Sequence, residues 1–248
     1  MSLSDIRDAL LVAKHVIAFT GAGVSVASGI PDFRSPDGIW ARYPPEQFAT
    51  IEAFERDPEG WWTFHWALSA AFAGAAPNTA HEALGALDAL GLLKAVITQN
   101  IDGLHQRAGH SQVIELHGGN SAMQCLRCDA DVDRPVPLGG EVPRCETCRA
   151  VLKPDVVLFG EQLDHRKLHQ AQLQAAQADM CLVVGTSAVV FPAASIPILT
   201  HESDGAVCVF NRESTNLTDG GFARWFVEGP AEETLPRLIE LVRAELEG

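Results

Sequence analysis

The stretch that decides the fold is FTGAGVSVASGIPDFR, residues 19–34. The apolar run 16–19 leads into it and predicts a buried strand. The turn that follows carries three glycines: Gly21, Gly23 and Gly29. Glycine adopts backbone angles closed to other residues and lets a ligand approach the main chain closely. Because a strand that ends in such a turn and opens into a helix presents N–H groups to an anion, we expect a phosphate-binding turn here.

The residues around this turn distinguish it from the common dinucleotide fingerprint. G-x-G-x-x-G needs a glycine where Val26 stands, so the glycine spacing alone is weak evidence. The turn is followed directly by Ile30-Pro31-Asp32-Phe33-Arg34. A loop that only connects two elements has little need of a proline, an acid, an aromatic and an arginine in a row. We therefore interpret this segment as part of a ligand site.

Composition bounds the class of protein. The chain has 248 residues, which can form one large α/β domain or a main domain with a small satellite, and with 47% hydrophobic residues it can bury a core. A net charge of −14 argues against nucleic acid as a direct partner, because phosphate backbones attract Lys and Arg. No apolar run approaches the ~20 residues that span a bilayer, so no membrane association is expected. The N-terminus lacks the basic start and apolar centre of a signal peptide, which predicts a cytoplasmic location.

A unit of strand, polar turn and helix recurs about six times along the chain. Apolar runs that predict strands lie at 16–19, 95–98, 112–116, 153–159, 180–184, 206–210 and 224–227. Amphipathic patterns that predict helices lie at 78–93, 164–178, 192–199 and 231–246. This alternation indicates an α/β fold, a mostly parallel Rossmann-like sheet with helices on both faces.

Two segments leave that pattern and predict a smaller domain. Residues 35–77 hold four of the five tryptophans and read as short helices, which we expect to pack on the main sheet as a helical module. A lid over a nucleotide would need the same residues. Residues 118–154 form the second excursion. The main domain is then assigned to 1–34, 78–117 and 155–248, with the run 153–161 returning the chain to it.

Four cysteines give the most specific spacing in the chain: Cys125, Cys128, Cys145 and Cys148. Two C-x-x-C pairs sixteen residues apart match a structural zinc site. The spacer between the pairs has few large apolar residues, so a metal is needed to order it. Four thiolates leave no open coordination position, which predicts a structural ion. Disulfides are disfavoured in a chain with no export signal, and Cys181 and Cys208 read as core residues.

Polar clusters follow several predicted strands: Gln99, Asn100, Ile101 and Asp102; His117; Gly185, Thr186 and Ser187; Asn211. Open α/β sheets place ligands at the carboxyl ends of their strands, so these clusters should meet along one edge. An ordinary helix cap explains one of Asn100 and Asp102 but not the whole cluster. His117 ends a strand beside two glycines, and histidine suits proton transfer near neutrality. We expect no comparable setting for His81, His105 or His110.

These motifs occur in an order that resembles the sirtuins, a family of NAD-dependent protein-lysine deacylases. The motifs are GAGVSVASGIPDFR, TQNIDGLHQRAG, ELHGG, the paired C-x-x-C, KPDVVLFGE, VVGTS and VFN. The resemblance runs from about Lys14 to about Ala231. It implies NAD as co-substrate, one structural Zn²⁺ and acetylated proteins or peptides as substrates.

The resemblance also implies roles for individual residues. His117 matches the general base, and Phe33 matches an aromatic that shields the reacting ribose carbon. The positions that match NAD contacts are Gly21, Ala22, Gly23, Ser25, Asp32, Phe33, Arg34, Gln99, Asn100, Ile101, Asp102, Gly185, Thr186, Ser187, Asn211 and Ala231. The positions that match a peptide cleft, in which the substrate pairs as an extra strand, are Val156, Phe159, Gly160, Glu161 and Val189.

The reaction implied by the resemblance transfers the acyl group of lysine to ADP-ribose and releases nicotinamide, free lysine and 2′-O-acetyl-ADP-ribose. Relatives that remove succinyl or malonyl resemble one another in a Tyr-x-x-Arg pair, and residues 61–72 contain neither residue. An acidic acyl chain would be buried without a cationic partner, so we expect acetyl or another neutral acyl group.

Three alternative functions stay open from the sequence. A mono-ADP-ribosyltransferase would use the same NAD site with a different acceptor. An NAD oxidoreductase would need the full glycine fingerprint and an acid about 20 residues beyond it, and neither is present. A non-catalytic zinc-ribbon binding module would leave the polar strand ends unexplained.

Overall fold

The computed structural model describes residues 2–33, 36 and 38–248 of the chain. Six parallel strands form the main sheet in the order β3-β2-β1-β7-β8-β9. Their bounds are β1 (Val16–Thr20), β2 (Leu93–Thr98), β3 (Val113–Glu115), β7 (Met180–Val184), β8 (Ala206–Asn211) and β9 (Trp225–Glu228). The mostly parallel sheet predicted from the alternating pattern is confirmed.

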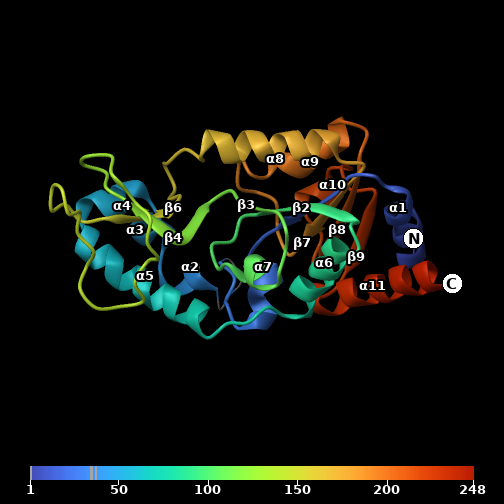
Figure 1. Ribbon diagram of the computed structural model, residues 1–248, viewed down its shortest axis with the longest axis horizontal. Coiled ribbons are helices and arrows are strands. Elements are labelled where there is room, and N and C mark those ends of the chain that lie inside the picture. Colours follow the sequence, from blue (N-terminus) through green and yellow to red (C-terminus); the bar gives the residue numbers. More distant parts are fainter. Residues whose placement is uncertain (1, 34–35, 37) are drawn as a thin grey trace.

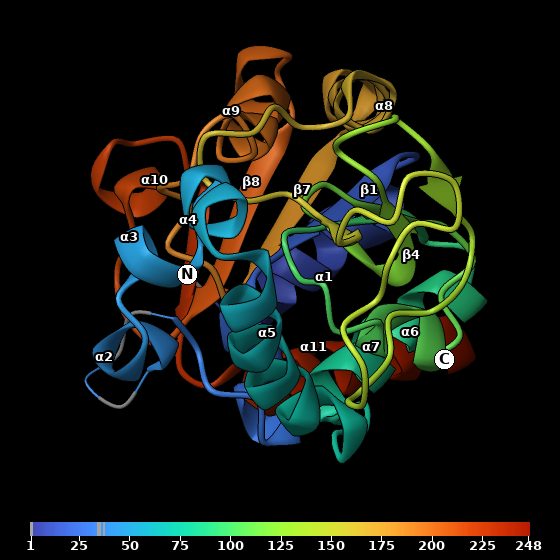
Figure 2. The same cartoon turned by 90° about the vertical axis from the view of Figure 1, so that its left-hand side faces the viewer.

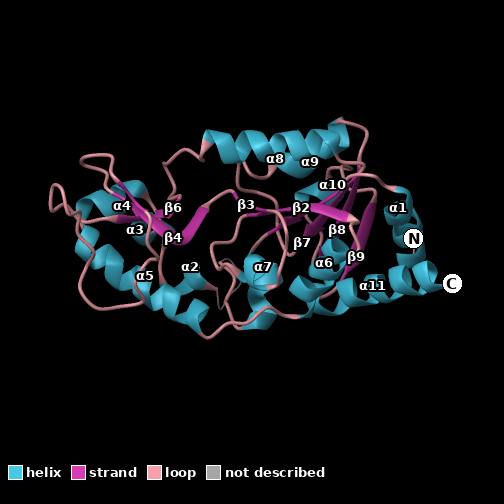
Figure 3. Ribbon diagram, in the orientation of Figure 1, coloured by secondary structure: helices cyan, strands magenta, loops and turns pink. Residues whose placement is uncertain are grey.

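Helices cover both faces of this sheet (Figures 1 and 3). One face carries α1 (Leu3–Val12), α6 (Thr79–Ala89) and α11 (Ala231–Glu247), and the other carries α8 (His165–Gln177) and α9 (Ser195–Glu202). Every residue of β1 and β7 is buried, because successive side chains point into the two opposite cores. Cys208 lies in the first core and Cys181 in the second, as expected for small apolar residues.

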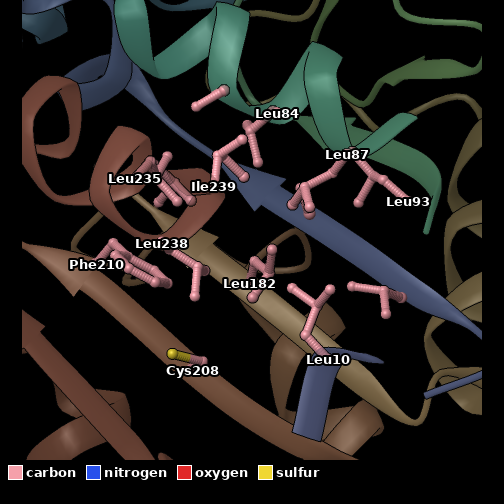
Figure 4. Packing of buried hydrophobic residues seen from close by; sticks show 14 of the residues in the cluster. Leu10, Leu84, Leu87, Leu93, Leu182, Cys208, Phe210, Leu235, Leu238 and Ile239 are labelled. Atoms are coloured by element: carbon pink, nitrogen blue, oxygen red, sulfur yellow. The ribbon is translucent and has the colours of Figure 1, made fainter. Parts of the chain in front are cut away.

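The first core is closed by leucines from three helices (Figure 4). Leu84 of α6, Leu235 of α11 and Leu10 of α1 are fully buried against the sheet. Each such side chain contributes about 1.5–3 kcal/mol relative to exposure. This packing holds β1 rigidly, and the glycine turn begins where β1 ends.

Polar side chains cap the starts of several helices. Asp57 accepts a hydrogen bond from the N–H of Gly60 at the start of α5 (Pro58–Ala73), and Asn78 caps α6 in the same way. Asp164 caps α8. The helix expected from residue 192 begins only at Ser195, because residues 191–194 form turns.

A second, three-stranded sheet lies at one end of the molecule, in the order β5-β4-β6. Its strands are β4 (Gly118–Gln124), β5 (Asp131–Val132) and β6 (Lys153–Val156). The sequence predicts that the run 153–161 returns the chain to the main domain, but its strand β6 joins the small sheet, because it pairs antiparallel with β4 across the cysteine segment. The expected boundary at residue 155 therefore falls inside β6, and the division into domains stays a prediction.

Three short helices, α2 (Ile39–Arg42), α3 (Pro45–Phe48) and α4 (Ile51–Arg56), and the longer α5 complete this end of the molecule. Figure 2 looks at them with the main sheet behind. Trp62 of α5 is fully buried in a core that also contains Met123, Cys125 and Cys145, so the helical module packs on the cysteine segment. The remaining helices are the 3₁₀ helix η1 (Ala22–Ser28), α7 (Leu104–Arg107) and α10 (Asn216–Asp219). No helix in the described part of the chain is both long and apolar enough to span a bilayer.

Candidate active site

A cavity of about 730 Å³ lies between the carboxyl ends of the main-sheet strands and the small helices. It is lined by every described residue that the sequence assigned to NAD: Gly21, Ala22, Gly23, Ser25, Asp32, Phe33, Gln99, Asn100, Ile101, Asp102, Gly185, Thr186, Ser187, Asn211 and Ala231. His117, Val156, Phe159, Gly160 and Glu161 also line it. Val189 does not line the cavity, although its neighbour Val190 does, and Arg34 falls outside the described residues.

The glycine turn is packed against the turn after β7. The N–H of Gly23 donates to the carbonyl of Gly185 over 2.8 Å, and a Cβ on Gly23 would lie 2.7 Å from that oxygen. Gly185 itself has φ +58° and would place a Cβ 2.3 Å from the nitrogen of Val24. These two glycines therefore let two backbones meet, in addition to any approach by a ligand. The expected helix after the turn is the 3₁₀ helix η1.

A network of polar side chains forms the floor of the cavity. Ser25 donates to Asp102 over 2.7 Å and accepts from the amide of Asn100 over 3.1 Å. The same amide donates to the carbonyl of Gly21 over 3.2 Å, which ties the strand end after β2 to the glycine turn. The other oxygen of Asp102 accepts from the N–H of Leu104 at the start of α7. Asp102 therefore both holds the backbone just before α7 and forms part of the site.

Gln99 connects this floor to the neighbouring strand ends. Its amide donates to the hydroxyl of Thr186 over 2.9 Å and to the carbonyl of Thr20 over 3.3 Å. The backbone carbonyl oxygen of Gln99 lies 2.9 Å from Nδ1 of His117. The ends of four strands, β1, β2, β3 and β7, are thus fixed to one another around the cavity, as the sequence predicts for residues at the carboxyl ends of parallel strands.

His117 is set up as a proton acceptor. A carbonyl oxygen only accepts, so Nδ1 carries the proton and Nε2 keeps its lone pair. Burial lowers the pKa of His117, although the hydrogen bond to Gln99 opposes that shift. The ring is therefore neutral near pH 7 and can take a proton from a group placed in the cavity.

Aromatic residues from the helical module form the opposite wall. Phe48, Trp61, Phe64 and Leu68 line the cavity, together with His65, whose pKa burial lowers to about 4. The sequence favoured simple packing for this segment. Phe54 and Trp62 are buried in a core, but they share it with the cysteine segment, so the expected packing on the main sheet is wrong. The wall residues face the cavity, as the alternative of a lid requires. The sequence signal for this wall is the i, i+3, i+4 and i+7 spacing of Trp61, Phe64, His65 and Leu68, which places these residues on one face of a helix.

The mouth of the cavity is apolar. Phe33 packs on Trp40 with ring centroids 4.9 Å apart, and Trp40 lies 6.5 Å from Phe159. Phe159 is held from behind, since its N–H donates to Ala49 and its carbonyl accepts from Ile51. Phe159, Val189 and Phe191 are 45%, 42% and 66% exposed, so each of them presents apolar surface to solvent.

Three histidines occupy a setting that the sequence did not predict. His81, His105 and His110 form a buried row, with neighbouring ring centroids 4.9 and 5.2 Å apart. Nε2 of His105 lies 2.9 Å from the hydroxyl of Thr20, directly beneath the glycine turn. Each ring lies on the inner side of its segment. None of the three histidines directly follows a predicted strand, so the pattern that indicated His117 does not indicate them.

The four cysteines converge as their spacing predicts. Their Sγ atoms lie within 4.8 Å of one another, and two pairs are 3.4 and 3.6 Å apart. Thiolates around a tetrahedral Zn²⁺ with bonds of about 2.3 Å stand about 3.8 Å apart, so the donor set fits this ion. Each C-x-x-C is followed by a residue with positive φ, Asp129 at 55° and Arg149 at 63°, which gives two matching knuckles.

Comparison with known proteins identifies the family. The model of the Sir2 family matches residues 21–192. The NAD-dependent protein deacylase of Pyrococcus furiosus is 46% identical over 97% of this chain and 98% of its own length. The NAD-dependent protein deacetylase of Sulfurisphaera tokodaii is 43% identical over 99% and 98%. A Sir2 homologue solved as an ADP-ribose complex superposes with a TM-score of 0.93 at 40% identity, covering 100% of this chain and 98% of the other. A Sir2 homologue solved as an NAD complex gives 0.90 at 40% identity, over 98% and 94%. The chain therefore belongs to the Sir2 family.

Proposed function

We propose that this protein is an NAD-dependent protein-lysine deacetylase. The observation that carries the proposal is the convergence of a neutral His117, the Ser25–Asp102–Asn100 network and the glycine turn on one cavity. Relatives over nearly the whole length are named as deacylases and deacetylases that depend on NAD. The donor set and the backbone cradle fit a dinucleotide with its diphosphate near Gly21–Ser25.

Residues in different parts of the cavity have different proposed roles. NAD supplies a ribose carbon that accepts the acyl oxygen once nicotinamide has left. We infer that Asn100 and Asp102 hold the nicotinamide carboxamide and a water, and that Gly185, Thr186, Ser187, Asn211 and Ala231 contact the adenosine half; all of them line the cavity, which supports these roles. His117 accepts a ribose hydroxyl proton at Nε2, and the Gln99 carbonyl keeps the ring in that tautomer. Phe33 and Trp40 cover the site against water.

The substrate side of the cavity favours an extended peptide with a neutral acyl-lysine. We infer that residues 156–161 and the segment at Val190, both of which line the cavity, border the bound peptide, which suits recognition by strand addition. The wall from α5 consists of apolar or aromatic side chains and a His65 that is neutral at pH 7. A succinyl carboxylate would lose its hydration there without gaining a cation from α5.

The test is incubation of the full chain with NAD and matched acetyl- and succinyl-lysine versions of one peptide, followed by mass analysis of every product. We expect free lysine peptide, nicotinamide and acetyl-ADP-ribose, with the acetyl peptide consumed faster. ADP-ribose attached to protein or peptide would instead support the mono-ADP-ribosyltransferase alternative. Faster succinyl removal would overturn the acyl assignment.

Intact thiolates in the zinc site also bear on location. Four cysteines bind a metal only while they are not oxidised to disulfides, so the site suits a reducing compartment such as the cytoplasm.

A further inference from the structure

Lys153 is a charged residue in the interior of the small sheet. Only 1% of its side chain is exposed, at the first position of β6. Its ammonium group has three acceptors: the carbonyl of Val156 at 2.7 Å, the carbonyl of Pro154 at 3.1 Å and Oε2 of Glu161 at 3.1 Å. An ammonium group has three protons to donate, so every donor is used.

The partner carboxylate fixes the end of the same segment. Oε2 of Glu161 also accepts from the N–H of Leu158 over 2.8 Å, and the N–H of Glu161 donates back to the carbonyl of Leu158 over 3.0 Å. These bonds close residues 158–161 into a turn. The Lys153–Glu161 pair therefore spans the segment from the start of β6 to the end of this turn.

The same segment is tied directly to the proposed general base. The N–H of Val157 donates to the backbone carbonyl of His117 over 2.9 Å. The groups that Lys153 holds, Val156 and Glu161, lie on either side of this bond and both line the cavity. A shift of the segment would change the distance between a bound peptide and His117.

A buried ammonium is a costly way to stabilise a fold. Burial lowers the pKa of Lys153, and Glu161 offsets that effect only in part. An apolar residue of similar volume often stabilises a core as well as a buried ion pair does. The arrangement is better explained by what the pair holds in place than by the stability it adds.

We propose that Lys153 is a positioning residue for the acylated peptide: by holding the Val156 carbonyl and the Glu161 carboxylate, it sets the edge on which the substrate strand pairs. It touches neither substrate nor NAD. The inference rests on the proposed function, because it assigns a device for peptide binding.

The test compares Lys153→Met with Arg144→Met in the zinc-loaded full chain. Arg144→Met removes the exposed ion pair with Glu59 in the same small part of the molecule and serves as the matched control. We expect Lys153→Met to raise the KM for acetyl peptide at least tenfold, with the KM for NAD within twofold and kcat within about threefold. Arg144→Met should change none of the three. An unchanged peptide KM, or equal rises in both KM values, would overturn the inference.

Amide exchange in the free protein gives a second readout. Lys153→Met should speed exchange at Leu158 and Glu161 and leave the strands of the main sheet unchanged. If Lys153→Met does not fold, Glu161→Gln replaces it, because the Glu161 side chain is 18% exposed. Faster exchange with a raised peptide KM then supports the inference, whereas a raised KM without faster exchange shows direct peptide contact and overturns it. If the wild-type chain turns over no acylated peptide, the proposed function fails, and exchange at Leu158 still decides whether Lys153 holds the segment.

Discussion

His117 owes its assignment to one hydrogen bond and to its burial. Nδ1 is committed to the Gln99 carbonyl, and burial holds the pKa below the ordinary 6.5. A base with a lowered pKa stays unprotonated to lower pH. The value of kcat/KM should therefore fall only as the pH drops below 6.5. His117→Ala should reduce the deacetylation rate by about 10²–10⁴-fold. It should leave NAD affinity, measured by calorimetry, nearly unchanged.

The matched control is His169→Ala, which removes an exposed histidine of α8. It should reproduce the wild-type rate and pH profile. Retained activity in His117→Ala would contradict the assignment of the base.

Gly23 allows a prediction about backbone packing. A methyl group there would meet the carbonyl oxygen of Gly185 at 2.7 Å, and neither backbone can move without disturbing β1 or β7. Gly23→Ala should destabilise the fold by about 1–3 kcal/mol in urea unfolding, as overpacking does. It should also weaken NAD binding. Gly74→Ala is the control, since a Cβ at Gly74 meets nothing within 4 Å, and equal stability of the two variants would contradict this account.

At the scale of single residues, the sequence predicts which residues lie at strand ends, but not which residues they contact. That Asn100 and Asp102 follow a strand is readable, because a polar cluster after an apolar run marks a strand end. That Ser25 joins them is not, since 75 residues or more separate it from either. Contacts of this kind follow from the register of β1 against β2.

The zinc segment is the element whose order depends most on a bound group. Cys125 and Cys145 are buried in the same core as Trp62, whose indole N–H donates to Leu152. Cys145→Ser should therefore release zinc and change tryptophan fluorescence, because four of the five tryptophans lie in residues 40–66. Zinc content by mass spectrometry and emission spectra measure the two effects. Cys208→Ala, in the main core, should keep its zinc, and a metal-free Cys145→Ser with unchanged emission would contradict the prediction.

Elements were predictable where the signal is local. Asp57, Asn78 and Asp164 start helices because a side-chain oxygen accepts the first free N–H groups, and that chemistry is visible in sequence. The sheet to which β6 belongs was not visible. The apolar run 153–159 could pair in either sheet. β6 pairs antiparallel with β4, and the cysteine knuckles lie between these two strands along the chain.

At the scale of the whole molecule, the parallel order of the main sheet follows from alternating strands and helices. The contact between the two excursions does not follow from their sequences. It depends on residues such as Trp66, whose indole donates to the carbonyl of Pro137 in the cysteine segment, 71 positions away. The row of buried histidines is equally a product of the assembled fold, because it needs α6, α7 and the segment before β3 together.

That row, together with the buried His65 of α5, predicts how global stability depends on pH. Burial lowers the pKa of His81 and His65 to about 4 and lowers those of His105 and His110. Because these side chains bind protons more readily when unfolded, stability is retained above pH 6.5 and lost as the pH falls from 6.5 towards 4. A shift from 6.5 to about 4 corresponds to about 3 kcal/mol for His81 alone. Glu115 acts in the opposite sense, since burial raises its pKa, but it is one group against these four histidines and His117, whose pKa burial also lowers.

The measurement is urea unfolding at a series of pH values between 7.5 and 4.5. His105→Leu should reduce the slope of unfolding free energy against pH by up to about 1.4 kcal/mol per unit between pH 6 and 5, the value for one proton. The replaced ring contacts the Thr20 hydroxyl, which keeps its hydrogen bond to Thr98 in the variant. His169→Gln, at an exposed position, should leave the slope as it is. A folded His105→Leu protein with the wild-type slope would show that the buried row does not govern the acid sensitivity of the fold.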